Sequence, residues 1–96
     1  MNPEPSVAPE IKALIGEQIV VDTDSSYVYI GKLEAAGADF LTLSKVDVHD
    51  TNDTQSSKEH YTHESKKLGT RNNRKFVYVR LPRVVSISKL DDVIQF

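Results

Sequence analysis

The chain has 96 residues and no cysteine, and its charged side chains leave a net charge of −2 at pH 7. A chain of this length forms one small domain, and without cysteine it has neither disulfides nor thiolate metal ligands. It contains no apolar run long enough to span a membrane and no basic, apolar leader at its N-terminus, so we expect a soluble cytoplasmic protein.

The charges are unevenly distributed along the chain. Residues 1–53 carry ten acidic side chains and three lysines, whereas residues 54–90 carry nine basic side chains and two acidic ones. From Lys66 to Arg83 there are seven bases and no acid. This segregation predicts either a positive patch on an acidic body or a solvated basic loop, and the sequence does not decide between them.

The first predicted element is a short helix over residues 9–15, after a disordered tail over residues 1–8. Pro9 suits the first helical position, and Gly16 is placed to end the helix in a left-handed conformation. An apolar stripe at helical spacing is formed by Ile11, Leu14 and Ile15.

Five runs rich in β-branched and aromatic residues follow, and they predict a mainly β domain over residues 9–96. The runs are EQIVVD (17–22), YVYIGKLEA (27–35), DFLTLSKVDV (39–48), KFVYVRL (75–81) and RVVSISKL (83–90). Gly31 indicates a bend in the second run, and the shift of apolar positions after Leu43 indicates a β-bulge at Ser44 and Lys45. Such bends close small barrels, so we predict a strongly bent five-stranded antiparallel barrel, an SH3-like roll with a short N-terminal helix.

The same alternation predicts which side chains form the core. The predicted core residues are Ile11, Leu14, Ile19, Val21, Val28, Ile30, Leu33, Leu41, Leu43, Val77, Val79, Val85 and Ile87.

Residues 49–75 interrupt the strand pattern with a polar and basic insertion. A helix is predicted inside it, with Asp53 or Thr54 as the N-cap and Gly69 at its end. Only two residues of this helix are apolar, so we expect it to be marginal in isolation and the insertion to be the most mobile part of the domain.

Three segments resemble the sequence motifs of the Sm and Sm-like superfamily. ALIGEQIVVD (13–22) resembles the helix end and first strand of that family, YVYIGKLEAAGADFLTL (27–43) its first motif, and FVYVRLPRVVSIS (76–88) its second motif. The resemblance covers residues 9–48 and 76–90 and points to a divergent bacterial-type member with a long insertion. It implies a homo-oligomeric ring of five to seven subunits, in which the fourth strand of one subunit pairs with the fifth of the next.

The resemblance also implies a single-stranded RNA site at the corner RLPR (80–83). By this resemblance, Arg80 matches the arginine with which the family stacks on a base or contacts phosphate. Asp39 and Phe40 stand near the position of the Asp and Asn with which the family's first motif holds a base, and Phe40 carries over as an aromatic platform. Leu81 replaces the usual glycine of the second motif. The alternative for Arg80 and Arg83 is a pair of outward charges that guard a strand edge. The candidate RNA-binding residues, including the phosphate-contacting bases of the insertion, are Asp39, Phe40, Arg71, Arg74, Lys75, Arg80 and Arg83.

The strand pairing of the family would place the subunit contacts on either side of Pro82, which sets the corner. The candidate interface residues are Phe76, Val77, Tyr78, Val79, Val84, Val85, Ser86 and Ile87.

No enzyme signature appears in the chain, because it has no phosphate-binding glycine loop, no zinc-protease motif and no nucleophile elbow. We therefore expect no catalytic residue, no cofactor and no metal; His60 and His63 share one helix face but alone make a weak metal site. Two alternatives stay open. The fold can serve as a protein-interaction or structural module without nucleic acid, or the chain can be another small barrel, since LIGEQIVVDTD (14–24) also resembles the start of PRC-barrel domains.

Overall fold

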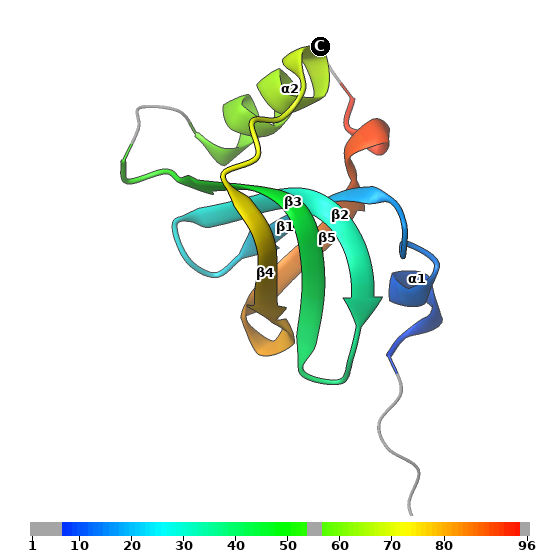
Figure 1. Ribbon diagram of the computed structural model, residues 1–96. Helices are drawn as coiled ribbons and strands as arrows, with labels where there is room; N and C mark the ends of the chain where they lie inside the picture. Colours follow the sequence, from blue (N-terminus) through cyan, green and yellow to red (C-terminus); the bar gives the residue numbers. More distant parts are fainter. Residues whose placement is uncertain (1–6, 54–56, 95–96) are drawn as a thin grey trace, which may run out of the picture.

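The computed structural model describes residues 7–53 and 57–94, and its main feature is one strongly bent antiparallel sheet (Figure 1). The strands lie in the order β4-β3-β2-β1-β5, so β4 and β5 are the two outer strands. The predicted mainly β fold with five antiparallel strands is confirmed. The strands are β1 (Gln18–Thr23), β2 (Tyr27–Ala36), β3 (Phe40–Asp50), β4 (Arg74–Arg80) and β5 (Val84–Lys89).

The N-terminal helix α1 (Pro9–Lys12) begins at Pro9 as predicted but ends earlier than expected. Residues 13–16 continue as a turn, and Gly16 closes this turn with a φ of 93°. The Gly16 N–H donates to the carbonyl oxygen of Leu33 at 2.7 Å, which fastens the end of the turn to β2. The helix thereby packs its partly buried apolar side chains against the core.

A β-bulge bends β3 near the position that the sequence predicts. Ile30 of β2 pairs with Asp47, whereas Lys32 pairs with Ser44, so β3 contains one extra residue there. Lys45 lies inside this bulge with a φ of 50°. The extra residue reverses the alternation, and for this reason Leu43 and Val46 both face the core.

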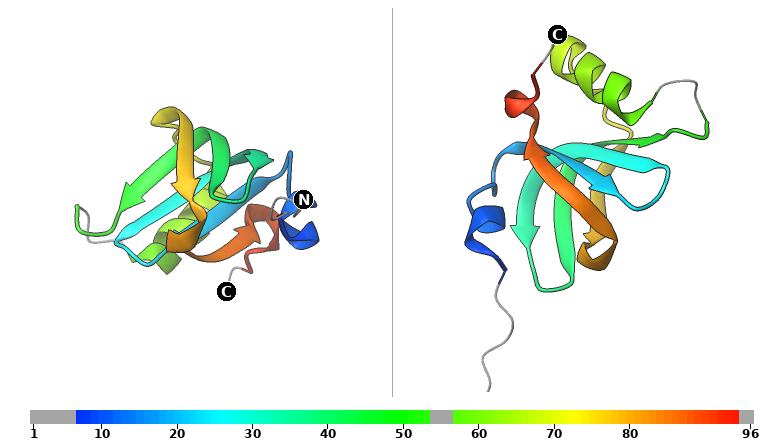
Figure 2. Two further views of the ribbon diagram at one scale, coloured as in Figure 1. Left: turned by 90° about the horizontal axis from the view of Figure 1, so that it is seen from below. Right: turned by 180° about the vertical axis from the view of Figure 1, so that it is seen from behind.

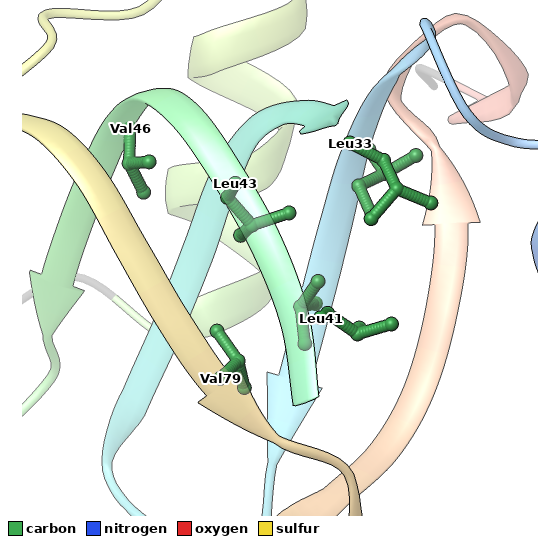
Figure 3. Close-up of a cluster of buried hydrophobic side chains, with 7 residues drawn as sticks. Leu33, Leu41, Leu43, Val46 and Val79 are labelled. Carbon is green, nitrogen blue, oxygen red and sulfur yellow. The ribbon is translucent and has the colours of Figure 1, made fainter. Parts of the chain in front are cut away.

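The concave face of the sheet holds the main core (Figure 3). Its buried residues are Ile19, Val21, Leu33, Leu41, Leu43, Val46 and Val79. Of the other predicted core residues, Val28 and Ile30 are buried, and Ile11, Leu14, Val77 and Ile87 are partly buried against this cluster.

Val85 is wrong as a core prediction, because 65% of the residue is exposed. The register between β1 and β5 shifts at this point: Asp22 pairs with Ser86 and Thr23 with Val84, which leaves Val85 without a partner residue on β1.

The opposite face of the sheet carries a second, smaller core, which was not predicted as separate from the main one. Its buried residues are Val20, Val28, Ile30 and Leu90. Helix α2 (Lys58–Leu68) and the short 3-10 helix η2 (Leu90–Asp92) cover this face, and Figure 2 shows the two close together. Tyr61 and Val93 complete the packing as partly buried side chains.

Helix α2 lies within the predicted insertion and ends at Gly69 as expected, but its N-cap differs. The N-cap is Ser57, whose side chain accepts a hydrogen bond from the N–H of His60. Asp53 lies in a turn after β3, so it is wrong as the N-cap, and Thr54 is outside the described residues. Strands β3 and β4 also extend into the predicted insertion from both sides. Among the described residues, no helix has the length and apolar character needed to cross a membrane.

Candidate functional site

The corner between β4 and β5 is a 3-10 turn, η1 (Leu81–Arg83). Pro82 occupies the middle of the turn, as the sequence predicts for a corner residue. The Leu81 N–H donates to the carbonyl oxygen of Asp39 at 2.8 Å, and the Leu81 side chain packs against the core. Leu81 thus fastens the end of β4 to the turn that leads into β3.

Three predicted site residues come together beside this corner. Arg80 is the cross-strand partner of Phe40, and Asp39 directly precedes Phe40. Residues Asp39, Phe40 and Arg80 are all exposed, and 46% of Phe40 is accessible. An exposed guanidinium beside an exposed ring can contact phosphate and stack on an unpaired base.

The other predicted bases lie at the far end of β4. Arg74 and Lys75 begin the strand and Arg71 precedes it, whereas Arg80 ends it. Six residue steps of an extended strand separate Arg74 from Arg80 by about 20 Å. The candidate RNA-binding residues therefore form two groups and not one patch.

The connection before β4 is held by polar contacts. The Asn73 side chain accepts a hydrogen bond from the N–H of Val48 and donates one to the Val48 carbonyl, both at 3.0 Å. The Arg71 N–H donates to the carboxylate of the buried Asp47 at 3.2 Å. These contacts fix the backbone of the basic segment while the side chain of Arg71 stays exposed.

The predicted interface residues lie on the two outer strands. Within residues 7–53 and 57–94, β4 is paired with β3 alone and β5 with β1 alone. Val79 is buried and Val77 partly buried, whereas Phe76 and Tyr78 point outward with 61% and 68% exposure. Each outer strand therefore presents an unpaired backbone edge.

Comparison with known proteins shows what this arrangement of strands is. No protein-family model matches the chain, and no curated protein matches it. Its structure is similar to that of AF-Sm2, an Sm-like protein from Archaeoglobus fulgidus, with a TM-score of 0.57 and 18% identity over 88% of this chain and 97% of that one. The chain has the Sm-like fold. It is also similar to a chain in the structure of the NatC complex bound to CoA, with a TM-score of 0.54 and 20% identity over 84% of each chain.

In this Sm-like fold, Arg83 is held by a residue that sequence reasoning did not connect to it. The Arg83 Nε lies 2.8 Å from the Asp24 carboxylate, and the Asp24 N–H donates to the Arg83 carbonyl at 3.0 Å. The β1–β2 turn therefore partly neutralises one of the two corner arginines. The two residues are 59 positions apart, and no local pattern in the sequence indicates the pair.

The histidines of α2 do not assemble a metal site. His60 lies 3.1 Å from Glu64 and His63 lies 3.0 Å from Glu59, so each imidazole faces its own carboxylate one helical turn away. In the part of the chain that the structure describes, no three His, Asp or Glu side chains are grouped so that they could hold a metal ion.

Among the titratable groups of the described residues, the hydroxyl of Tyr61 in α2 is the most strongly perturbed. Its ring stacks on His49 with the centroids 3.9 Å apart, and its buried hydroxyl makes no hydrogen bond to the described residues. Burial first, and then the neighbouring Asp47 carboxylate, raise the pKa of Tyr61 far above its usual value. This group lies on the face opposite the main core, away from the corner, and we assign it to packing.

Proposed function

We propose that the protein is a non-enzymatic Sm-like module that assembles into a ring of five to seven subunits and binds single-stranded RNA at the arginine corner. The observation that supports this best is the position of β4 and β5 at the two outer edges of one bent sheet (Figure 2). It is the strand order that the sequence resemblance requires for pairing between subunits.

The free strand edges support this assembly. An unpaired strand edge presents a row of N–H and C=O groups that can pair with another chain. In the proposed assembly β4 of one subunit pairs with β5 of the next, and a head-to-tail contact of this kind closes into a ring when the rotation fits. Exposed apolar side chains at the β5 edge, such as Val85, would add buried area to the contact.

The geometry of the corner supports the RNA site. Arg80 and Phe40 are exposed partners on neighbouring strands, and Arg80 is followed by the 3-10 turn that contains Pro82. In a ring the pair recurs once per subunit, so weak single contacts act together on one strand of RNA.

Light scattering with and without oligouridine tests the assembly. The expected mass is five- to sevenfold that of the 10.8 kDa chain at micromolar concentration, and a monomeric mass would contradict the ring. Binding of labelled oligouridine tests the site: an Arg80→Ala, Arg83→Ala double variant should bind more weakly than the wild type and than a Lys12→Ala control in α1. A ring whose affinity is the same in all three would keep the assembly and remove the site.

A protein-interaction module without nucleic acid is the second candidate. It is favoured by the Arg83–Asp24 ion pair, which occupies one corner arginine, and by the similarity to a chain of a protein complex, NatC. An intact ring that binds no oligonucleotide even at low salt would support this candidate, because electrostatic binding to phosphate is strongest there.

A further inference from the structure

The outward face of β4 carries a row of exposed side chains that the folded subunit does not cover. Phe76, Tyr78 and Arg80 occupy alternate positions and therefore point to the same side of the strand. Their cross-strand partners on β3 are Ser44, Thr42 and Phe40. Two aromatic residues exposed by 61% and 68% on adjacent positions of one face are an unusual surface for a small domain.

Basic side chains lie at both ends of this row. Arg74 and Lys75 are exposed at the start of β4 and Arg80 is exposed at its end, and the chain contains no acidic residue between Glu64 and Asp91. Two acidic residues lie near this row. Asp39 is exposed next to Phe40, at the Arg80 end. The Glu34 carboxylate accepts a hydrogen bond from Ser44 at 2.5 Å and lies 3.7 Å from the Lys32 ammonium, which partly compensates its charge.

We propose that the outward face of β4 is a stacking platform for single-stranded nucleic acid, with bases on Phe76 and Tyr78 and phosphates at Arg74 and Arg80. This inference rests on the proposed RNA binding at the corner, and it extends that site along the whole strand. Proteins hold single strands of nucleic acid by combining aromatic rings with basic side chains. The rings suit any sequence, because every nucleobase has a face that can stack. The two rings are about 7 Å apart along the strand, and each accepts one base.

The platform stays available in the proposed ring. Pairing between subunits uses the backbone edge of β4, which lies in the plane of the sheet, whereas the two rings stand perpendicular to that plane. The same strand can therefore pair with a neighbour through its backbone and hold RNA on its outward face.

The test compares two double variants in binding of labelled oligouridine and oligoadenine. The Phe76→Ala, Tyr78→Ala variant should bind about 5- to 150-fold more weakly for each ring removed. The slope of log affinity against log salt should be unchanged, because no phosphate contact is lost. The Phe76→Tyr, Tyr78→Phe variant keeps both rings and should bind like the wild type. A Leu68→Ala variant removes an exposed apolar side chain from α2, away from the corner and both strand edges, and should also bind like the wild type.

The outcomes separate this inference from the function on which it rests. A wild-type protein that binds neither oligonucleotide would overturn both. If the wild type binds and the Phe76→Ala, Tyr78→Ala variant binds equally well, the platform is wrong and the corner site stands. If that variant instead no longer has the mass of the oligomer, the two aromatic side chains belong to a contact between subunits, and the platform is also wrong.

Discussion

Replacing Gly31 by alanine should destabilise the fold, because the backbone of β2 passes very close to the bulge of β3. A methyl group at this position would lie 3.0 Å from the Ser44 carbonyl oxygen and 3.2 Å from Cγ2 of Val46. The Val46 side chain is fully buried in the core, and the Ser44 carbonyl belongs to the sheet ladder, so neither atom can move freely. Overpacking of this kind costs about 1–3 kcal/mol.

The lower entropy of the unfolded chain offsets about 0.4–1 kcal/mol of that cost. Gly37 provides the matched control, because a methyl group there would meet only the Phe40 carbonyl oxygen at 3.7 Å, an ordinary contact. Gly37→Ala should therefore be neutral or slightly stabilising.

Urea unfolding followed by far-UV circular dichroism measures the difference between these two variants. The midpoints should differ by on the order of 1 M urea for a domain of this size. Both variants must be compared at one protein concentration, since self-association would stabilise the folded state by mass action. A Gly31→Ala midpoint equal to or above that of Gly37→Ala would refute the close approach at the bulge.

Three further predictions concern the two cores. Leu43→Ala should lower the free energy of unfolding by about 2–5 kcal/mol, because Leu43 is fully buried; an unchanged urea midpoint would remove it from the core. Lys58→Met should speed amide hydrogen exchange in α2 but not in β3, because the Lys58 ammonium contacts the Asp22 carboxylate and two carbonyl oxygens of the β1–β2 turn. Tyr61→Phe should change stability little at neutral pH, since the lost hydroxyl has no hydrogen bond among the described residues. The raised pKa of Tyr61 means that the wild type loses stability as the pH rises above 10.0, the usual tyrosine value, and Tyr61→Phe should lose less over that range; an equal loss would show that Tyr61 does not contribute.

The strands and the bulge could be predicted because they depend on local alternation. Val28 and Ile30 in β2 and Leu41 and Leu43 in β3 are apolar residues at every second position, and the shift after Leu43 indicates the bulge that the structure contains. The second core was missed although IVV (19–21) gives a signal for it, since a continuous apolar run in a strand indicates burial on both faces.

The position of α2 could not be predicted, because polar contacts between distant parts of the chain hold it. Lys66 donates to the carbonyl oxygens of Asp91 and Val93, and Thr62 and Ser65 are buried on the side of the helix that faces the sheet. Apolar periodicity alone predicts a helix with few side chains to bury, and therefore a marginal one. The partners that anchor this helix are 25 to 36 residues away in the chain.

The arrangement of the bases leads to a final prediction about ligand length. The basic side chains of β4 are spread along the strand, because β4 is extended and places Arg74 and Arg80 about 20 Å apart. A mononucleotide can reach the basic side chains at only one end of β4. An oligonucleotide of several nucleotides can reach both ends of the strand and the aromatic rings between them. Affinity for oligouridine should therefore rise steeply with length until the strand spans β4, and uridine monophosphate should compete poorly even at matched nucleotide concentration. Competition of equal strength by the mononucleotide would show that one end alone carries the binding, and the extended platform along β4 would then be wrong.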